Sequence, residues 1–330
     1  MPFFSVIIPT YNREQFLLRS VSSVLKQSFD SYEIIVVNDG STDDSLELLS
    51  TISDPRLRVI TTPNRGVSSA RNTAIFNSRG EYLLFLDSDD SFLCDYLFKF
   101  NESLVEYSYP DILIGGIIAI NNDGSSSAIS PQMSIILDPL SFKRVFMDKT
   151  MNQDGLFGYI AGKAVSRRFI SDYSIIFNTS LKLAEDLDFW IQCYTHANSI
   201  ALFPYQGYQY FTSIPGSSVF ADDVDYLSQL SIWSRIYRYI QPVDQLELDF
   251  FNKKFTGYAL STFNELKDLR YRRVKQLFDA VKAHRVETSY RLIHNGKPLA
   301  LLLELGSVPL LFYYLKLRHW VHDKRNHSCI

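Results

Sequence analysis

The chain has 330 residues, a formal net charge of −3, 46% hydrophobic residues and 21% charged residues. These values are typical of a folded protein with one large or two medium domains. They argue against nucleic-acid binding, which requires a clustered basic surface. Cys94, Cys193 and Cys329 are far apart and match neither a disulfide framework nor a zinc motif. Together with an N-terminus that lacks the pattern of a secretory signal, they predict a cytoplasmic location.

Residues 3–87 alternate short apolar runs with segments of helical periodicity. Strands are predicted at Phe3–Pro9, Glu33–Asn38, Leu57–Thr61 and Tyr82–Asp87. Between them, apolar residues at helical spacing predict one helix around Phe16–Leu25, one around Leu46–Ile52 and one over Val67–Ser78. This alternation predicts an α/β fold with a parallel sheet flanked by helices.

Each predicted strand ends in a polar, turn-prone segment. The four ends are Pro9–Asn12, Asn38–Ser41, Thr62–Asn64 and Asp87–Asp90. In an open α/β sheet, ligands bind beyond the carboxyl ends of the strands. We therefore expect these side chains to form a polar cleft, suited to a metal, at one edge of the sheet.

The pattern loosens after Asp90. A helix is predicted at Tyr96–Ser108, a strand at Ile112–Ile120, a turn at Asn121–Gly124 into a return strand, and a helix near Leu140–Asp148. Residues 158–212 combine strands with a helix that starts near Glu185, and the sequence is mainly helical from about 221. A domain boundary is expected within 215–222, next to Pro215–Ser218.

The segment Pro298–Leu315 is strongly apolar but is interrupted by Glu304, Gly306 and Pro309. It is therefore shorter than the ~20 uninterrupted apolar residues of a membrane span. A basic segment, Lys316–Trp320, follows it. Two interpretations stay open: a buried helix pair, or a helix over 298–325 that contacts a membrane surface at the inner face of the plasma membrane.

Four motifs occur together in the first 90 residues. They are SVIIPTYNR at 5–13, EIIVVNDGSTD at 33–43, NRGVSSARN at 64–72 and FLDSDD at 85–90. In order and spacing they resemble glycosyltransferase family 2, and a weaker match continues to about 220. The resemblance implies a GT-A fold, which is Rossmann-like with a mostly parallel sheet and flanking helices. It also implies an inverting transfer from a nucleotide sugar.

The expected organisation follows from this resemblance. Residues 1–220 would form the GT-A domain, with a nucleotide-sugar-binding half at 1–90 and an acceptor half at 91–220. Residues 221–330 would form a mainly helical C-terminal region. The implied partners are a nucleotide-sugar donor and a glycan or lipid-linked acceptor, in the synthesis of a bacterial surface polysaccharide.

The residues of the donor site are assigned partly from their chemistry. Tyr11 is placed to stack on a base, and Asp39 accepts hydrogen bonds only, so it can bind a base N–H such as the imide of uracil. Their alternative interpretations are a packed ring and a turn-forming carboxylate. The resemblance adds donor contacts for residues in three motifs: Pro9, Asn12, Arg71, Asn72, Asp87 and Ser88. Arg71 can hold a diphosphate oxygen or pair with the acidic strand ends.

Asp87 and Asp89 form an Asp-x-Asp motif at the end of a hydrophobic strand. Residues two apart on an extended chain point the same way, so their carboxylates repel each other unless a cation lies between them. Mg²⁺ and Mn²⁺ prefer such oxygen ligands. The resemblance makes Asp89 the direct metal ligand and Asp87 a metal or ribose contact, and Asp90 is expected to cap the next helix. A solvated acidic turn is the alternative.

Glu185 and Asp186 lie near the start of a predicted helix. A positioned carboxylate can take the proton of an acceptor hydroxyl as the hydroxyl attacks. By resemblance, Asp186 is the expected catalytic base, with Glu185 second and Asp188 facing elsewhere. The alternative is a favourable charge at a helix N-terminus.

Four further residues carry weaker signals. Lys163 would approach a phosphate or lie at the surface, Tyr208 and Tyr210 would line the acceptor cleft or pack in the core, and Trp190 is expected in the core. A sugar nucleotidyltransferase is disfavoured because no glycine-rich loop follows the first strand, and a Rossmann dehydrogenase because G-x-G-x-x-G is absent there. A non-catalytic nucleotide-sugar-binding subunit stays an alternative.

Overall fold

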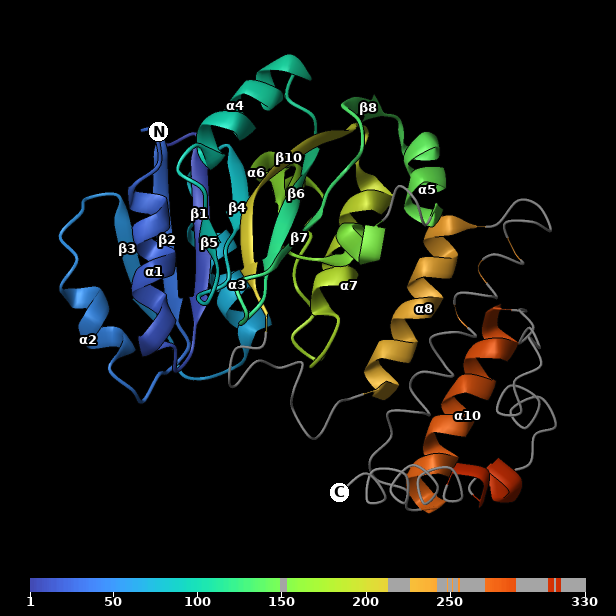
Figure 1. Cartoon of the computed structure of the whole chain (residues 1–330). Coiled ribbons are helices and arrows are strands. Elements are labelled where there is room, and N and C mark those ends of the chain that lie inside the picture. The colour runs from blue at the N-terminus through green and yellow to red at the C-terminus, as the bar shows by residue number, and fades with distance from the viewer. Residues whose placement is uncertain are drawn as a thin grey trace. The chain divides into compact units, whose positions relative to one another are not determined.

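Helices and strands alternate through the first half of the computed structural model (Figure 1). The structure describes residues 1–148, 153–212, 226–241, 248, 251, 255, 271–288, 308–311 and 313–315. The chain divides into two units, Met1–Asp222 and Asp223–Ile330. The functional halves expected within the first unit stay predictions.

The first 85 residues form the predicted β-α repeat. The elements are β1 (Phe4–Thr10), α1 (Glu14–Leu25), β2 (Tyr32–Asn38), α2 (Ser45–Ser50), β3 (Leu57–Thr61), α3 (Val67–Asn77) and β4 (Tyr82–Phe85). The strands lie in the order β3-β2-β1-β4 and pair in parallel. All four predicted strands and three predicted helices are confirmed. Strand β4 ends two residues early because the chain turns there, with the N–H of Asp90 bonded to the carbonyl of Asp87 at 3.0 Å.

The second part of this unit extends the same sheet with mixed pairing. Its elements are β5 (Ser91–Phe92), α4 (Tyr96–Glu106), β6 (Ile112–Ile120), β7 (Ser126–Ile129), β8 (Ile135–Leu137), α5 (Pro139–Met147), the 3-10 helix η1 (Gln153–Gly158), β9 (Lys163–Ser166), α6 (Arg167–Asp172), α7 (Glu185–His196) and β10 (Ile200–Phe211). Strand β9 lies antiparallel between β4 and β6, whereas β10 is parallel to β6 and antiparallel to β5. The α/β GT-A-like fold is therefore confirmed, with continuous parallel pairing confined to the first four strands.

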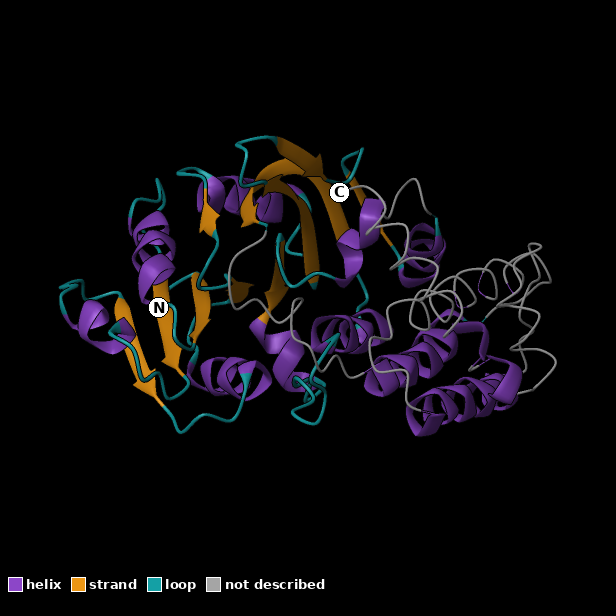
Figure 2. Ribbon diagram, turned by 60° about the horizontal axis from the view of Figure 1, so that its bottom comes forward, coloured by secondary structure: helices purple, strands orange, loops and turns teal. Residues whose placement is uncertain are grey.

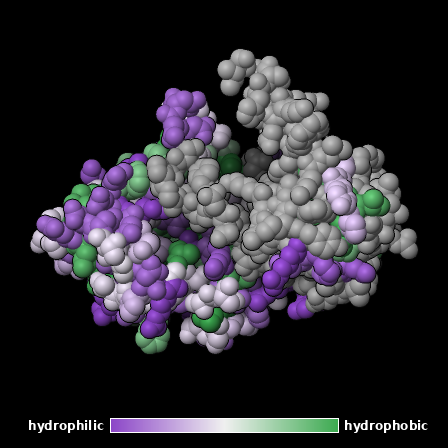
Figure 3. Space-filling model, turned by 90° about the horizontal axis from the view of Figure 1, so that it is seen from below, coloured by the Kyte–Doolittle hydropathy of each residue, from purple (hydrophilic) through white to green (hydrophobic). Residues whose placement is uncertain are grey.

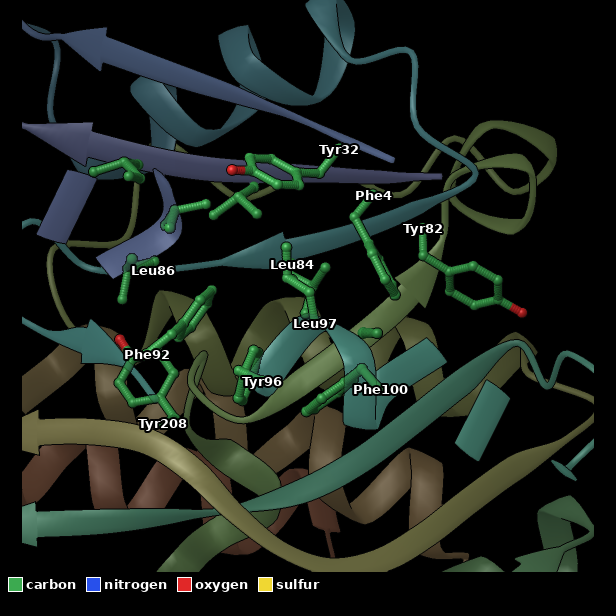
Figure 4. Packing of buried hydrophobic residues seen from close by; sticks show 14 of the residues in the cluster. Phe4, Tyr32, Tyr82, Leu84, Leu86, Phe92, Tyr96, Leu97, Phe100 and Tyr208 are labelled. Atoms are coloured by element: carbon green, nitrogen blue, oxygen red, sulfur yellow. The ribbon is translucent and has the colours of Figure 1, made fainter. Parts of the chain in front are cut away.

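Helices cover both sides of the sheet (Figure 2). On one side, alternate β1 residues such as Phe4 and Val6 belong to a buried cluster with Leu17 of α1 and Leu97 of α4 (Figure 4). On the other side, Phe85 of β4 contacts the ring of Phe189 of α7 at 5.7 Å between centroids. The sheet is thus buried on both faces, and its carboxyl edge is left for ligands. On the face drawn in Figure 3, most of the described surface is hydrophilic and hydrophobic side chains occur in small groups.

The described residues of the second unit are mainly helical, as predicted. Helices α8 (Tyr226–Ile240) and α10 (Tyr271–Thr288) pack against each other. The Trp233 ring of α8 lies 5.6 Å from the rings of Phe251 and Phe255. Most of the expected membrane-contact segment, 298–325, lies outside the described residues. Within the described parts of the chain, no helix has both the length and the apolar character needed to cross a membrane.

Candidate active site

The loop after β1 is fixed by the loop after β2. Asn12 adopts a left-handed conformation with φ 51°, its N–H donates to Ser41 Oγ at 3.0 Å, and its Oδ1 accepts from the N–H of Thr42 at 2.8 Å. Pro9 is buried within β1. Between them Tyr11 remains 43% exposed. Its ring is therefore available to stack on a planar ligand, and the packed-ring interpretation does not apply.

Asp39 holds the loop between β3 and α3. Its buried carboxylate accepts from the N–H groups of Arg65 at 3.0 Å and Gly66 at 2.7 Å. Gly40 permits this approach, because it has φ +75° and a Cβ there would lie 2.8 Å from the backbone N of Asn64. Asp39 is therefore a loop-forming carboxylate, and its contact with a base stays a prediction.

The Asp-x-Asp turn follows β4. The carboxylates of Asp87 and Asp89 are partly exposed, and Ser88 between them is buried. Burial and the charge of Asp87 raise the pKa of Asp89, although Arg13, whose Nε lies 3.5 Å from Asp89 Oδ2, opposes the shift. Adjacent carboxylates with excess negative charge are suited to a hard divalent cation.

These two carboxylates would need further ligands to hold a metal. Across the described residues, no group of three or more His, Cys, Asp or Glu side chains converges as a complete metal site. Mg²⁺ is usually bound by one or two carboxylates together with substrate phosphates. The donor set thus fits a metal that binds together with a diphosphate.

Asp90 does not cap the next helix, because strand β5 comes first. Its buried carboxylate accepts from Tyr208 Oη at 2.7 Å and from the N–H of Phe211 at 3.0 Å, both on β10. Tyr208 Oη in turn accepts from the N–H of Asp87 at 3.1 Å. Tyr208 is fully buried, so it braces the Asp-x-Asp turn from the core and does not line a cleft (Figure 4).

Arg71 joins carboxylates that are far apart in the sequence. From α3, its Nη2 donates to Asp87 Oδ1 at 2.9 Å, and its Nη1 donates to Asp186 Oδ1 at 2.6 Å and to Glu185 Oε1 at 3.5 Å. Burial would lower the pKa of Arg71, but the three carboxylates together raise it, so the guanidinium stays charged. The structure matches the interpretation of Arg71 as an ion-pair partner of the acidic residues. Its contact with a diphosphate stays a prediction.

Asn72 faces away from this cluster. Its Nδ2 donates to the carbonyl of Phe177 at 2.9 Å, and its Oδ1 accepts from the N–H of Phe177 at 2.8 Å. Phe177 lies in the segment that leads into α7, and its ring lies 5.2 Å from the Arg71 guanidinium. Asn72 therefore fixes the approach to α7, and a donor contact for it stays a prediction.

Asp186 lies in the first turn of α7, which follows Ala184 in a left-handed conformation with φ 59°. Its side chain is 25% exposed. Burial raises the pKa of Asp186 to about 7; the charges of Glu185 and Asp87 add to the shift, and Arg71 opposes it. A carboxylate with a pKa near neutrality is suited to accept a proton from a hydroxyl group.

Lys163 lies inside the protein, contrary to both sequence interpretations. Its Nζ donates to the carbonyls of Leu156 at 2.8 Å and of Tyr159, and it lies 5.0 Å from the centroid of the Trp190 ring. Desolvation lowers the pKa of Lys163 to about 7. Because the ammonium is buried and donates to backbone carbonyls, it cannot reach a phosphate. Trp190 is fully buried, which confirms its expected place in the core.

Two arginines beside Asp89 were missed from the sequence. Arg13 is the ion-pair partner described above, and it closes the first motif, SVIIPTYNR, so that motif was its signal. Arg19 donates through Nη2 to the carbonyl of Asp89, and its guanidinium lies 3.6 Å from the centroid of the Phe211 ring. The sequence around Arg19 gives no signal, because its partners are about 70 or more residues away along the chain.

Comparisons with known proteins point to one family. The sequence model of glycosyl transferase family 2 matches residues 5–173. The chain is 41% identical over 119 residues to "Glycosyltransferase GlyA" of Streptococcus pneumoniae, a match that covers 36% of this chain and 17% of that protein. It is 26% identical over 257 residues to "Uncharacterized glycosyltransferase EpsJ" of Bacillus subtilis, covering 76% of this chain and 70% of that one.

A third relative has solved structures. The poly(ribitol-phosphate) beta-N-acetylglucosaminyltransferase TarS of Staphylococcus aureus is 28% identical over 232 residues, covering 68% of this chain and 38% of TarS. The crystal structure of TarS 1-349 in complex with UDP-GlcNAc matches with a TM-score of 0.71 and 22% identity, over 97% of this chain and 92% of that chain. The structural likeness shows a shared fold.

Proposed function

Because the chain belongs to glycosyl transferase family 2, we propose that it moves a sugar from a nucleoside diphosphate sugar to a hydroxyl group of an acceptor, with inversion at the anomeric carbon. One observation carries this proposal: Arg71 joins Asp87, at the end of β4, to Asp186, at the start of α7. The carboxylate expected to act at the donor diphosphate and the one expected to act on the acceptor are thus held by one guanidinium.

The donor is proposed to bind beyond β1, β2 and β4. The exposed ring of Tyr11 would stack on the base and Asp39 would accept its N–H, while Pro9, Asn12 and Ser88 shape the surrounding loops. An acceptor-only group at Asp39 favours uridine. The UDP-GlcNAc complex of TarS, a protein of the same fold, supports a uridine diphosphate sugar.

A divalent metal, Mn²⁺ or Mg²⁺, is proposed as the cofactor, with Asp89 as its direct ligand and Asp87 beside it. When bound, it would supply positive charge to the leaving diphosphate. Asp89 would then exchange its ion pair with Arg13 for the cation. We expect Asp89→Ala to remove the metal-dependent part of UDP affinity in calorimetry. Asp54→Asn is the control, because Asp54 forms an ion pair with Arg56 instead, and this variant should keep the metal-dependent UDP affinity of the wild type. Equal metal dependence of UDP affinity in both variants would exclude Asp89 as the ligand.

Asp186 is proposed to be the catalytic base. Its carboxylate takes the proton of the acceptor hydroxyl, the hydroxyl oxygen forms a bond to the anomeric carbon, and the bond from that carbon to the diphosphate oxygen breaks. The nucleoside diphosphate leaves with the electron pair. Arg71 holds Asp186 at 2.6 Å and thereby fixes the direction of attack.

The acceptor is proposed to be a glycan or a lipid-linked glycan of a bacterial surface polysaccharide. The name of TarS, a poly(ribitol-phosphate) beta-N-acetylglucosaminyltransferase, supports this setting. We propose that the protein works in the cytoplasm at the inner face of the membrane, where such acceptors are assembled. A contact through 298–325 would bring it to that surface.

A donor screen tests the proposed function. The purified chain is incubated with Mn²⁺ and a set of UDP-, GDP- and dTDP-sugars, and release of the nucleoside diphosphate is measured with and without saccharide acceptors. We expect metal-dependent release from one UDP-sugar. Donor binding without any release on every acceptor would support a non-catalytic subunit, and an absence of binding to all donors would refute the proposal.

A further inference from the structure

We propose that Tyr159 and Tyr210 form a stacking subsite for an uncharged sugar ring of the acceptor, and that buried Lys163 positions the Tyr159 side of it. The inference deepens the proposed function and rests on it. The two tyrosines come from segments about 50 residues apart in the sequence. Tyr210 lies on β10 near the Asp-x-Asp turn, and Tyr159 lies near the first turn of α7.

Tyr210 is fixed next to the Asp-x-Asp turn. Its neighbours on β10, Tyr208 and Phe211, both bind the Asp90 carboxylate, at 2.7 Å and 3.0 Å. The ring of Tyr210 itself remains 37% exposed, whereas Tyr208 is fully buried. Burial and the nearby charges of the Asp-x-Asp turn raise the pKa of Tyr210, and Tyr159 contributes to the same shift. Arg71 binds both Asp87 of this turn and Asp186 at the start of α7, so Tyr210 lies at one end of a continuous ion-pair cluster.

Tyr159 lies beside the first turn of α7. It follows η1, which packs on α7, and a Cβ built on Gly158 would lie 3.4 Å from Cδ1 of Leu187, the residue after Asp186. Leu156 and Phe157 of η1 are buried, but Tyr159 is 43% exposed. The chain thus presents a single aromatic ring at the end of η1, next to the proposed base.

Lys163 holds the backbone of this segment. Its buried ammonium donates to the carbonyls of Leu156, Tyr159 and Ala161 and packs over the Trp190 ring of α7. Buried carbonyl groups need partners, and here one side chain supplies them for a whole turn. Since Tyr159 contributes one of the three carbonyls, Lys163 is a positioning residue for its ring.

The chemistry favours an uncharged sugar. A tyrosine offers an apolar ring face and a hydroxyl group, which suits a ring with both C–H and O–H groups. Beside Tyr159, Glu185 and Asp186 share the single Arg71 guanidinium with Asp87, so this end of the cluster keeps a net negative charge that would repel a phosphate group of an acceptor. A pyranose is therefore favoured over a polyol phosphate.

The test measures saccharide binding directly. The full chain with UDP and Mn²⁺ is titrated with methyl β-glucoside and methyl N-acetyl-β-glucosaminide, and with ribitol 5-phosphate as the anionic comparison, by saturation-transfer NMR. We expect Tyr159→Ala and Tyr210→Ala each to weaken glycoside binding about tenfold, the effect of losing one stacked ring. Tyr159→Phe and Tyr210→Phe should retain most of the binding.

The control is Tyr173→Ala. Tyr173 is also exposed, but its ring lies 4.8 Å from that of His196, at the far end of α7 from Asp186. Its removal should leave glycoside binding unchanged. Lys163→Met should weaken glycoside binding while UDP affinity, measured by calorimetry, stays that of the wild type.

Three results would overturn the subsite: no glycoside binding to the wild type, unchanged binding in both Ala variants, or tighter binding of ribitol 5-phosphate. The donor screen tests the proposed function independently of the subsite. Tyrosine-dependent glycoside binding by a chain that binds no nucleotide would refute the donor site and support the subsite.

Discussion

Asp186 and Glu185 are neighbours in the sequence, but Arg71 distinguishes them. Its Nη1 lies 2.6 Å from Asp186 and 3.5 Å from Glu185. In Asp186→Asn the amide oxygen can still accept from Arg71, but the side chain can no longer take a proton. We expect kcat to fall about 10²–10⁴-fold, the usual contribution of a general base, with UDP affinity in calorimetry close to that of the wild type. Glu185→Gln is the matched control and should be milder; near-normal turnover of Asp186→Asn would assign the base elsewhere.

The protonation of Asp186 gives a second prediction at this scale. Burial raises the pKa of Asp186 to about 7. Below this pH the carboxyl group holds a proton and cannot accept another, and above it the carboxylate is available. The value of kcat/KM should therefore rise with pH through about 7 and then level off. A profile measured at saturating Mn²⁺ that is flat between about pH 5 and pH 8 would contradict this assignment.

Single residues also show where inference from the sequence stopped. Tyr11, Asp87 and Asp186 were predicted as site residues because each lies within a recognisable motif. The ion pair between Arg71 and Asp186 was not predictable, because it joins positions 115 residues apart. Lys163 was misplaced for a related reason: only the folded arrangement of η1 and Trp190 provides an environment that can bury an ammonium group.

Among the elements, the junction of the Asp-x-Asp turn with β10 determines how firmly the site is held. Tyr208 Oη donates to Asp90 in a buried hydrogen bond and accepts from the N–H of Asp87 in a part-buried one. Tyr208→Phe would remove the hydroxyl partner of both groups. Leaving a buried polar group without its partner costs about 1–3 kcal/mol of stability. We expect the free energy of unfolding, from urea denaturation, to fall by that amount.

Tyr205→Phe is the control for this junction. Tyr205 also lies on β10 and donates to an aspartate, Asp95 Oδ1, at 2.5 Å. This bond is only part-buried, so water can replace the lost hydroxyl group and the change in stability should be smaller. A Tyr208→Phe variant that is no less stable than Tyr205→Phe would show that the brace adds nothing to the stability of the turn.

The elements of the first half were predictable because their signals are local. Apolar runs of strand length and helical spacing fixed β1 to β4 and α1 to α3 to within about two residues, as expected for short periodic segments. The antiparallel insertion of β9 between β4 and β6 depends on contacts across about 80 and 50 residues of sequence. Asp90 was assigned to a helix cap for the same reason, since its partners on β10 lie 118 and 121 residues away.

For the whole molecule, the division at Asp222 separates the candidate site from the second unit. The buried cluster that supports the sheet and all the proposed donor, metal and base residues belong to Met1–Asp222. A unit with its own core can fold independently. We expect a chain ended after Asp222 to unfold cooperatively in urea and to bind UDP with Mn²⁺ as tightly as the full chain. The full chain carrying Asp89→Ala sets the level of binding without a metal ligand. A shortened chain that folds but binds UDP only at that level would show that the donor site needs residues 223–330. Aggregation of the shortened chain would show that its core needs them.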